Sequence, residues 1–218
     1  MTDALREELE ATTDGFHPPV YPFDRLDDAK AKAEAHDGGI VDLSIGTPFD
    51  PPAPAVLSAL AESRAERGYP SSKGGPAFRE AAAAWMARRF GIDVPSTAVA
   101  ACIGTKELVA GLPQWLSLRT PGRDTVLYPS LSYPTYEMGA VLARCRAVPV
   151  AERPGGGMDL GSIGEEDARR ALVLWVNSPS NPTGGVDDLE AAAAFGRRFG
   201  VPVFSDECYV EYTWEGPP

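Results

Sequence analysis

The stretch Val-Asn-Ser-Pro-Ser-Asn-Pro-Thr-Gly-Gly, residues 176–185, follows the apolar run Ala171–Val176 and precedes a helical pattern at Asp187–Phe199. The apolar run predicts a buried strand, and the prolines and glycines behind it predict a rigid loop. In an α/β sheet such a loop lies at the carboxyl ends of the strands, where ligands bind, and it would hold Asn181 there. Taken alone, the loop is more typical of an ordinary proline-rich connection. Other segments must decide between these interpretations.

From Val99 onward, strand patterns alternate with helix patterns. The expected strands are Val99–Ile103, Thr125–Tyr128, Ala147–Val150, Ala171–Val176 and Val201–Ser205, and the helices between them are Lys106–Leu118, Thr135–Cys145 and Asp187–Phe199. This alternation predicts an α/β fold whose mostly parallel sheet has right-handed crossovers. Because the strands are nearly all apolar, we expect helices on both faces of the sheet.

The first third of the chain is less regular. Residues 1–24, rich in proline and aromatic side chains toward their end, predict an extended arm. After the arm we expect a short helix, a strand and two helices, at Asp27–Ala35, Ile40–Ile45, Ala53–Arg67 and Pro76–Phe90. We therefore divide the chain into an arm with part of a small domain at 1–45 and a large domain at 46–218.

Composition excludes several classes of function. The 218 residues carry a net charge of -11, which argues against binding to nucleic-acid backbones or anionic membranes. The acidic N-terminus lacks the apolar segment of a signal peptide, and no run is long enough to span a membrane. Three cysteines and two histidines are too few and too scattered for a disulfide framework or a histidine-based metal centre. We expect a cytoplasmic protein.

Polar and aromatic residues follow four of the expected strands. Gly104–Lys106 opens a helix, where free N–H groups and the helix dipole favour an anion. Tyr133 offers an aromatic face, Asn181 an amide, and Asp206 a carboxylate at the end of a buried strand, with Tyr209 one turn further on. Each residue alone fits a structural role. Together they suit a flat, phosphorylated heteroaromatic cation.

These motifs resemble the class I/II aminotransferases, which are fold-type I pyridoxal-phosphate enzymes. The resemblance rests on Asn-Pro-Thr-Gly at 181–184 and Ser-Asp-Glu-Cys-Tyr at 205–209, with further matches in order at 68–79, 104–106 and 129–136. It covers the chain from about residue 20. Val-Asp-Leu-Ser-Ile-Gly-Thr-Pro at 41–48, together with the Ser-Lys-Gly-Gly and Asn-Pro-Thr-Gly segments, is most similar to bacterial succinyldiaminopimelate aminotransferases of the lysine pathway.

The resemblance implies pyridoxal 5'-phosphate as cofactor and a role for each candidate residue. Backbone N–H groups of the Gly104-Thr105-Lys106 turn would hold the phosphate, and Tyr133 would stack on the pyridine ring. Asn181 and Tyr209 would bind the phenolic oxygen of the ring, and Asp206 would pair with its nitrogen. Gly46 would lie where the substrate carboxylate enters, and Tyr69 would reach the phosphate of a neighbouring subunit. A homodimer is therefore expected. The resemblance also implies a cis peptide bond at Asn181–Pro182.

The family's Schiff-base lysine has no counterpart here. By the family pattern it lies a few dozen residues after the aspartate, whereas all the lysines of this chain, Lys30, Lys32, Lys73 and Lys106, precede the Asn-Pro-Thr-Gly segment. We expect the sequence to be the N-terminal portion of an aminotransferase, ending inside the large domain, and to be inactive in transamination by itself.

Three functions stay open at this point. The leading one is amino transfer between an amino-acid-like donor, with N-succinyl-diaminopimelate as a candidate, and a 2-oxo acid such as 2-oxoglutarate. Another fold-type I activity, such as a β-lyase, would share the cofactor contacts. A non-catalytic fragment or a regulatory or binding module with this fold is the third. Substrate profiling separates the two enzymes.

Overall fold

The computed structural model describes residues 22–44, 46, 49–64, 67–212 and 214, in two compact units, Met1–Pro51 and Pro52–Pro218. Most of the expected arm lies outside the described residues. The first unit contains η1 (Pro22–Leu26) and α2 (Asp27–Glu34), and the bounds of α2 are close to those of the helix predicted at Asp27–Ala35. The strand expected at Ile40–Ile45 is wrong, because residues 40–44 pair with no other strand among the described residues and the side chains of Val41 and Leu43 are exposed.

A four-stranded parallel sheet forms the centre of the second unit. Its strands are β1 (Thr125–Pro129), β2 (Arg146–Val150), β3 (Ala171–Asn177) and β4 (Val203–Asp206), in the order β2-β1-β3-β4. Every residue of β1 and β3 is buried, as the apolar runs predict. The predicted α/β class with a parallel sheet is confirmed.

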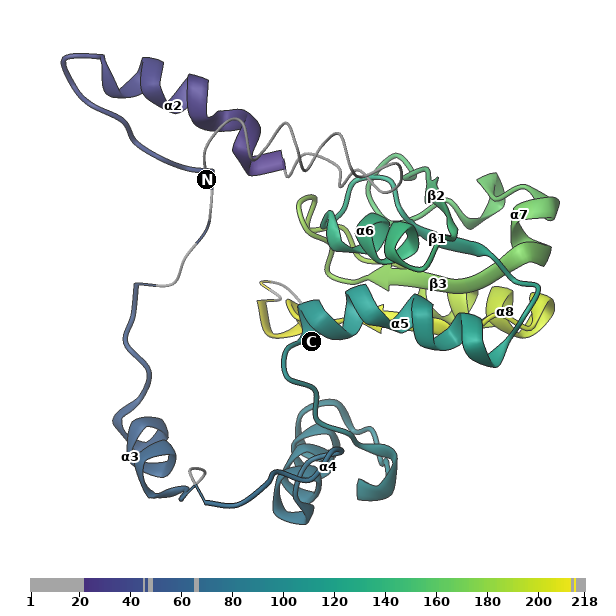
Figure 1. Ribbon diagram of the computed structural model, residues 1–218, viewed down its shortest axis with the longest axis horizontal. Helices are drawn as coiled ribbons and strands as arrows, with labels where there is room; N and C mark the ends of the chain where they lie inside the picture. Colours follow the sequence, from purple (N-terminus) through teal and green to yellow (C-terminus); the bar gives the residue numbers. More distant parts are fainter. Residues whose placement is uncertain (1–21, 45, 47–48, 65–66, 213, 215–218) are drawn as a thin grey trace, which may run out of the picture. The chain divides into compact units, whose positions relative to one another are not determined.

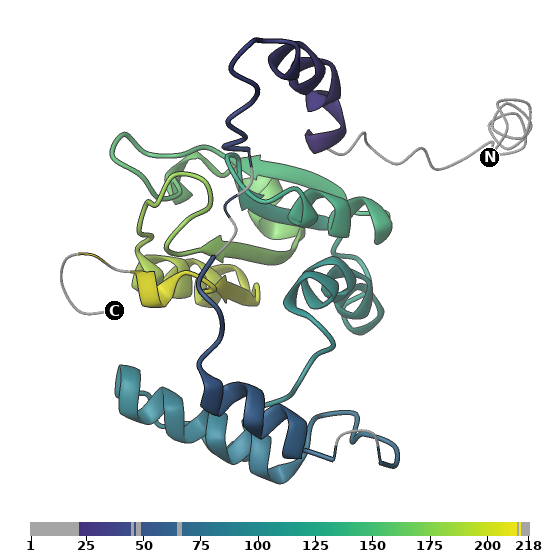
Figure 2. The same ribbon diagram turned by 90° about the vertical axis from the view of Figure 1, so that its left-hand side faces the viewer.

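Helices cover both faces of this sheet (Figure 1, Figure 2). On one face α5 (Thr105–Arg119) and α6 (Thr135–Leu142) pack on alternate side chains of β1 and β3, including Val126 and Trp175. On the other face α8 (Leu189–Phe199) packs on the intervening side chains, such as Leu174. The strands therefore alternate between two apolar cores, as expected for a sheet between helix layers.

Two glycines allow the helices to approach closely. A Cβ atom added to Gly139 of α6 would lie 3.0 Å from the carbonyl oxygen of Val109 in α5. One added to Gly196 of α8 would lie 2.7 Å from both the carbonyl oxygen of Val201 and a methyl group of Val203. On each face, the backbone of a helix therefore lies too close to neighbouring atoms to leave room for a side chain at this glycine.

The second unit also contains α3 (Pro54–Glu62), α4 (Pro76–Phe90) and α7 (Glu165–Arg170), with short 3-10 turns η2 (Ser96–Ala98), η3 (Leu160–Ser162) and η4 (Val210–Tyr212). The bounds of α4 match the prediction, since proline begins it and Gly91, in the left-handed region at φ 68°, ends it. The helix predicted over Ala53–Arg67 is shorter than expected.

The strand predicted at Val99–Ile103 is also wrong. Val99 has extended dihedral angles, but this segment joins no ladder among the described residues, and the Ile103 side chain is 94% exposed. A strand needs a neighbouring strand to satisfy its backbone groups, and an apolar pattern cannot supply one. No helix in the described part of the chain is long and apolar enough to cross a membrane.

Candidate functional site

A cavity of about 280 Å³ opens where β3 and β4 end, beside the N-terminus of α5. We call it the sheet-end cavity. Its lining combines hydroxyl, amide, carboxylate, thiol, amine and aromatic groups: Thr105, Lys106, Val109, Tyr133, Tyr136, Asn177, Asn181, Asp206, Cys208 and Tyr209. Candidate residues from several separate sequence motifs therefore line a single space.

The Asp206 carboxylate is the only acidic group in this lining. Asp206 is the last residue of β4, and the hydroxyl of Tyr136 donates a hydrogen bond of 2.8 Å to its Oδ2 atom. The backbone N–H of Cys208 donates to Oδ1 at 3.3 Å. A carboxylate can accept about four hydrogen bonds, so Asp206 retains capacity for a cationic N–H donor.

The loop after β3 is fixed to the end of β4 by Asn177. The Asn177 side chain donates to the carbonyl oxygen of Asp206 at 3.0 Å and accepts from the backbone N–H of Asn181 at 2.8 Å. The backbone N–H of Ser178 also donates to the Asp206 carbonyl oxygen. The Asn181–Pro182 bond is cis, as the resemblance implies, and so is Ser178–Pro179. Asn181 is therefore held at the cavity through Asn177, whose side chain is in turn hydrogen-bonded to β4.

The N-terminus of α5 forms another side of the cavity. No side chain caps this terminus, and a Cβ atom added to the N-cap residue Gly104 would meet no other atom within 4 Å. Thr105 and Lys106 line the cavity directly, whereas Gly104 adjoins it. A helix terminus without a side-chain cap favours an anion through its backbone N–H groups and dipole.

Two aromatic residues flank the cavity. The ammonium group of Lys106 lies 5.5 Å from the centre of the Tyr133 ring, within the range of a cation–π contact. Partial burial, followed by the nearby Cys208 and Asp206 groups, raises the pKa of Tyr209. Tyr209 therefore stays protonated near neutral pH and can donate a hydrogen bond.

Cys208 also faces the cavity, and its thiol is protected from ionisation. Burial, reinforced by the charge of Asp206, raises the pKa of Cys208 to about 11. Because the thiolate is the nucleophilic form, this cysteine is unsuited to nucleophilic catalysis at neutral pH. The described residues contain no cluster of histidine, cysteine and carboxylate groups that could hold a metal ion.

Besides Gly104, two sequence candidates do not line the cavity. Tyr69 lies in the loop between α3 and α4 and is fully exposed. Gly46 belongs to the first compact unit, where a Cβ atom would meet nothing within 4 Å. Their predicted roles stay predictions.

The structure adds residues to which sequence reasoning gave no role. Asn177 directly follows the apolar run Ala171–Val176 in the sequence and is the last residue of β3; a polar residue at this position was the available signal. Tyr136 is the second residue of α6 and is 1% exposed. The sequence alone does not reveal that its hydroxyl reaches a residue seventy positions later.

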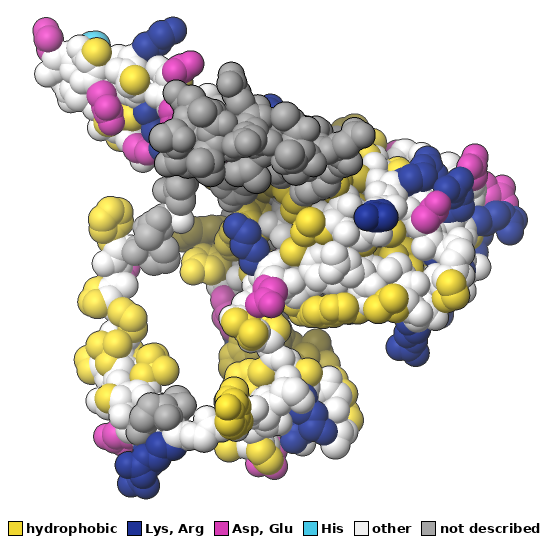
Figure 3. All heavy atoms as spheres, viewed as in Figure 1, with side chains coloured by type: hydrophobic (Ala, Val, Ile, Leu, Met, Phe, Trp, Pro, Cys, Tyr) yellow, Lys and Arg dark blue, Asp and Glu magenta, His cyan; other side chains and the backbone are white. Residues whose placement is uncertain are grey.

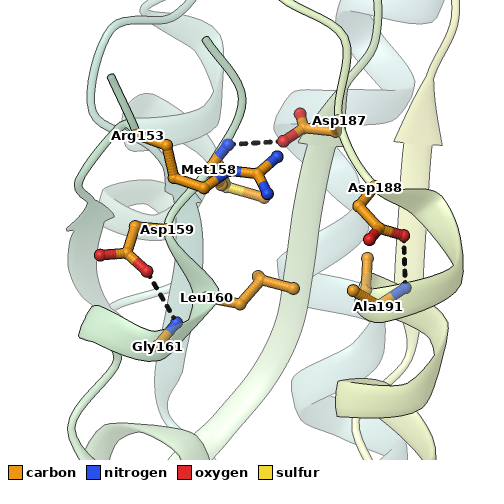
Figure 4. Close-up of a pocket in the computed structure, with 9 residues that line it drawn as sticks. Arg153, Met158, Asp159, Leu160, Gly161, Asp187, Asp188 and Ala191 are labelled. Carbon is orange, nitrogen blue, oxygen red and sulfur yellow. Dashed lines mark hydrogen bonds between the residues drawn. The ribbon is translucent and has the colours of Figure 1, made fainter. Parts of the chain in front are cut away.

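A second cavity, of about 170 Å³, lies between residues 153–161 and the start of α8 (Figure 4). We call it the α8 cavity. Its aspartates bind backbone groups: Asp187 accepts from the N–H of Met158 at 2.5 Å, Asp188 from that of Ala191 at 2.9 Å, and Asp159 from that of Gly161 at 3.1 Å. These contacts explain the acidic residues without a ligand.

Comparison with known proteins identifies residues 38–218 with the family model described as "Aminotransferase class I and II". A probable aminotransferase of Mycobacterium tuberculosis is 47% identical over 204 residues, which are 92% of this chain and 46% of that protein. An LL-diaminopimelate aminotransferase of Desulforudis audaxviator is 41% identical over 92% of this chain and 53% of its own length.

A solved structure is similar along most of the chain. It is a probable N-succinyldiaminopimelate aminotransferase from Thermus thermophilus, with a TM-score of 0.78 and 37% identity over 89% of this chain and 54% of that protein. The chain thus spans about half the length of the relatives it matches. The range matched by the family model contains the sheet and all the residues that line the sheet-end cavity.

Proposed function

Because this chain belongs to the family of class I and II aminotransferases, we propose that its sheet-end cavity holds pyridoxal 5'-phosphate and that the whole protein transfers amino groups. The family depends on this cofactor. The observation that carries the proposal is the position of Asp206, a carboxylate at the end of a parallel strand, in one cavity with Tyr133, Asn181 and Tyr209. In open parallel sheets, ligands bind at this edge.

The chemistry of the cavity fits the cofactor at each of its polar groups. A phosphate suits the uncapped start of α5, where the N–H groups of Thr105 and Lys106 would hold it next to Gly104. The adjacent glycine leaves space for that phosphate, since a Cβ atom there would meet nothing. The Lys106 ammonium adds a positive charge to the same side of the cavity.

The remaining groups suit the ring. Tyr133 would stack on the pyridine, Asn181 and Tyr209 would donate hydrogen bonds to its phenolic oxygen, and Asp206 would accept one from the protonated ring nitrogen. When bound, the cofactor supplies an electron sink for a substrate carbanion. The chain's contribution is to hold the ring nitrogen in its protonated form, which strengthens that sink.

For the substrate we propose an amino-acid-like dicarboxylate, with N-succinyl-diaminopimelate as the first candidate, and 2-oxoglutarate as acceptor. The names of the Desulforudis and Thermus relatives support a place in lysine biosynthesis. Gly46 would lie at the entry of the substrate carboxylate. In domain terms, residues 1–45 would serve as an arm with part of a small domain and residues 46–218 as the cofactor-binding domain. Such an enzyme would work in the cytoplasm.

A homodimer is part of the proposal. The surfaces of α3 and α4 carry exposed apolar side chains, namely Val56, Leu57 and Leu60 on α3 and Phe78 and Trp85 on α4. Figure 3 shows hydrophobic atoms gathered over these helices. Exposed apolar patches of this kind mark interaction surfaces, and Tyr69, in the loop between the helices, would reach the partner's phosphate. Sedimentation equilibrium of the whole protein tests this point, and a strict monomer would contradict it.

The cofactor proposal is tested on this chain with pyridoxamine 5'-phosphate, which binds without a covalent bond to a lysine. We expect saturable quenching of tryptophan fluorescence, because Trp175 is buried beside Tyr136, a residue of the cavity wall. Pyridoxamine lacking the phosphate should bind much more weakly. Equal affinity for the two compounds would contradict a phosphate site at α5.

The transfer reaction is tested on the whole protein that carries this chain. With N-succinyl-diaminopimelate and 2-oxoglutarate, glutamate should accumulate in step with loss of the donor. Release of ammonia and a keto acid from cysteine-type substrates, without glutamate, would favour the β-lyase alternative. Cofactor binding without turnover of any amino donor would favour a non-catalytic binding module.

A further inference from the structure

The Tyr136 phenol is the closest side-chain partner of the Asp206 carboxylate, at 2.8 Å from Oδ2. Sequence motifs assign it no role, and the predicted cofactor contacts do not include it. It is also the most buried tyrosine of the cavity lining, with 1% of its surface exposed. Breaking a hydrogen bond between a buried hydroxyl and a carboxylate costs free energy, so this contact restrains the Asp206 side chain.

Packing fixes the position of the phenol. Tyr136 lies on the first turn of α6, and its ring centre is 5.4 Å from that of Trp175 on β3. Trp175 in turn lies 5.5 Å from Phe204 on β4, two residues before Asp206. The ring is thus packed on Trp175 of β3, which in turn packs on β4, the strand that carries Asp206. Its hydroxyl cannot leave the carboxylate without repacking this core.

Electrostatics keep the phenol in its donor form. Burial, followed by the charge of Asp206 and its hydrogen bond, raises the pKa of Tyr136 well above its usual value. The nearby Cys208 and Tyr209 groups raise its pKa further. The hydroxyl therefore remains protonated wherever the protein is folded near neutral pH.

We propose that Tyr136 is a positioning residue that fixes the Asp206 carboxylate for the ring nitrogen of the cofactor; this inference rests on the proposed function. The Tyr136 hydroxyl binds Oδ2 and the Cys208 backbone N–H binds Oδ1, so each oxygen has one protein donor. Each oxygen keeps one further lone pair. The hydrogen bond stops the carboxylate from rotating about its terminal torsion, which is otherwise broad.

The test is Tyr136→Phe, which removes the hydroxyl and retains the ring that packs on Trp175. The probe is pyridoxamine 5'-phosphate labelled with ¹⁵N in the ring, whose NMR shift reports whether the ring nitrogen carries a proton. We expect affinity to fall about tenfold, the effect of one hydrogen bond to a charged group. We also expect the ring nitrogen to lose its proton at a lower pH than in the wild type.

The direction of the second effect separates two roles. If the phenol only withdrew charge from Asp206, its removal would make the ring nitrogen hold its proton to higher pH. That result, or an unchanged titration, would overturn the positioning role. A merely structural role would lower thermal stability and leave the titration of the bound ring unmoved.

Tyr128→Phe is the matched control, because Tyr128 lies in the same apolar core and does not line the cavity. It should bind the probe with wild-type affinity and titration. Asp206→Asn distinguishes the two proposals. If Asp206→Asn abolishes ring protonation while Tyr136→Phe changes nothing, only the positioning role fails. If the wild type does not bind the probe, the cofactor proposal fails and the positioning role fails with it.

Discussion

The sheet-end cavity and the α8 cavity both contain aspartates, and these aspartates differ in their hydrogen-bond donors. In the α8 cavity, Asp159, Asp187 and Asp188 each accept a hydrogen bond from a backbone N–H group, that of Gly161, Met158 and Ala191 respectively. In the sheet-end cavity, Asp206 stands at the end of a strand and accepts hydrogen bonds from the Tyr136 hydroxyl on α6 and from the backbone N–H of Cys208. Carboxylates that satisfy backbone N–H groups maintain the fold, whereas one that a side chain from a helix positions at a cavity is available to a ligand.

The largest expected effect follows from Asp206→Asn. An amide cannot compensate the positive charge of a protonated ring nitrogen, so the affinity for pyridoxamine 5'-phosphate should fall by about 3 kcal/mol, roughly a hundredfold. Equilibrium dialysis of variant and wild type measures this. Asp159→Asn in the α8 cavity is the control and should bind the probe as the wild type does. A comparable loss in both variants would erase the distinction between the cavities.

The next effect concerns thiol reactivity. With its pKa raised to about 11, Cys208 has little thiolate at about pH 8, and iodoacetamide should modify it about a hundredfold more slowly than a thiol of ordinary pKa. The rate should rise as the pH approaches that value. Peptide mass spectrometry follows it, with exposed Cys102 as internal reference. Bound pyridoxamine 5'-phosphate should slow the labelling of Cys208 and not that of Cys102, and rapid labelling of Cys208 at neutral pH would contradict its raised pKa.

A smaller loss is expected from Asn177→Ala. The buried side chain joins the Asp206 carbonyl oxygen to the Asn181 N–H group, and its removal leaves both without this partner. We expect the free energy of unfolding to fall by about 2 kcal/mol, with weaker probe binding. Urea denaturation and fluorescence titration measure the two effects. Unchanged probe affinity would show that the loop keeps Asn181 in place without this link.

The smallest effect is expected in the α8 cavity. Asp188→Ala removes the N-cap of α8 and should lower the free energy of unfolding by about 1 kcal/mol. Asp188→Asn, which retains a capping oxygen, should be close to the wild type. Neither variant should alter probe affinity. Weaker binding in Asp188→Ala at constant stability would mean that the α8 cavity takes part in cofactor binding after all.

Prediction from sequence was most accurate where local chemistry decides. The Pro76 start and Gly91 end fixed α4, and the apolar run of β3 predicted a strand buried on both faces. The strands predicted at Ile40–Ile45 and Val99–Ile103 are wrong, because these apolar segments pair with no other strand among the described residues. Consequently Thr105 and Lys106 line the cavity as the first residues of a helix that no strand precedes directly.

The sequence by itself determined the family, the parallel α/β architecture and the residue types that gather at the sheet edge, because strand ends of a parallel sheet converge there. Only the tertiary structure decided which partners those residues have. The Tyr136–Asp206 hydrogen bond joins residues seventy positions apart through the packing of α6 on β3 and β4. No local pattern encodes it, since it depends on how a helix layer packs against the sheet.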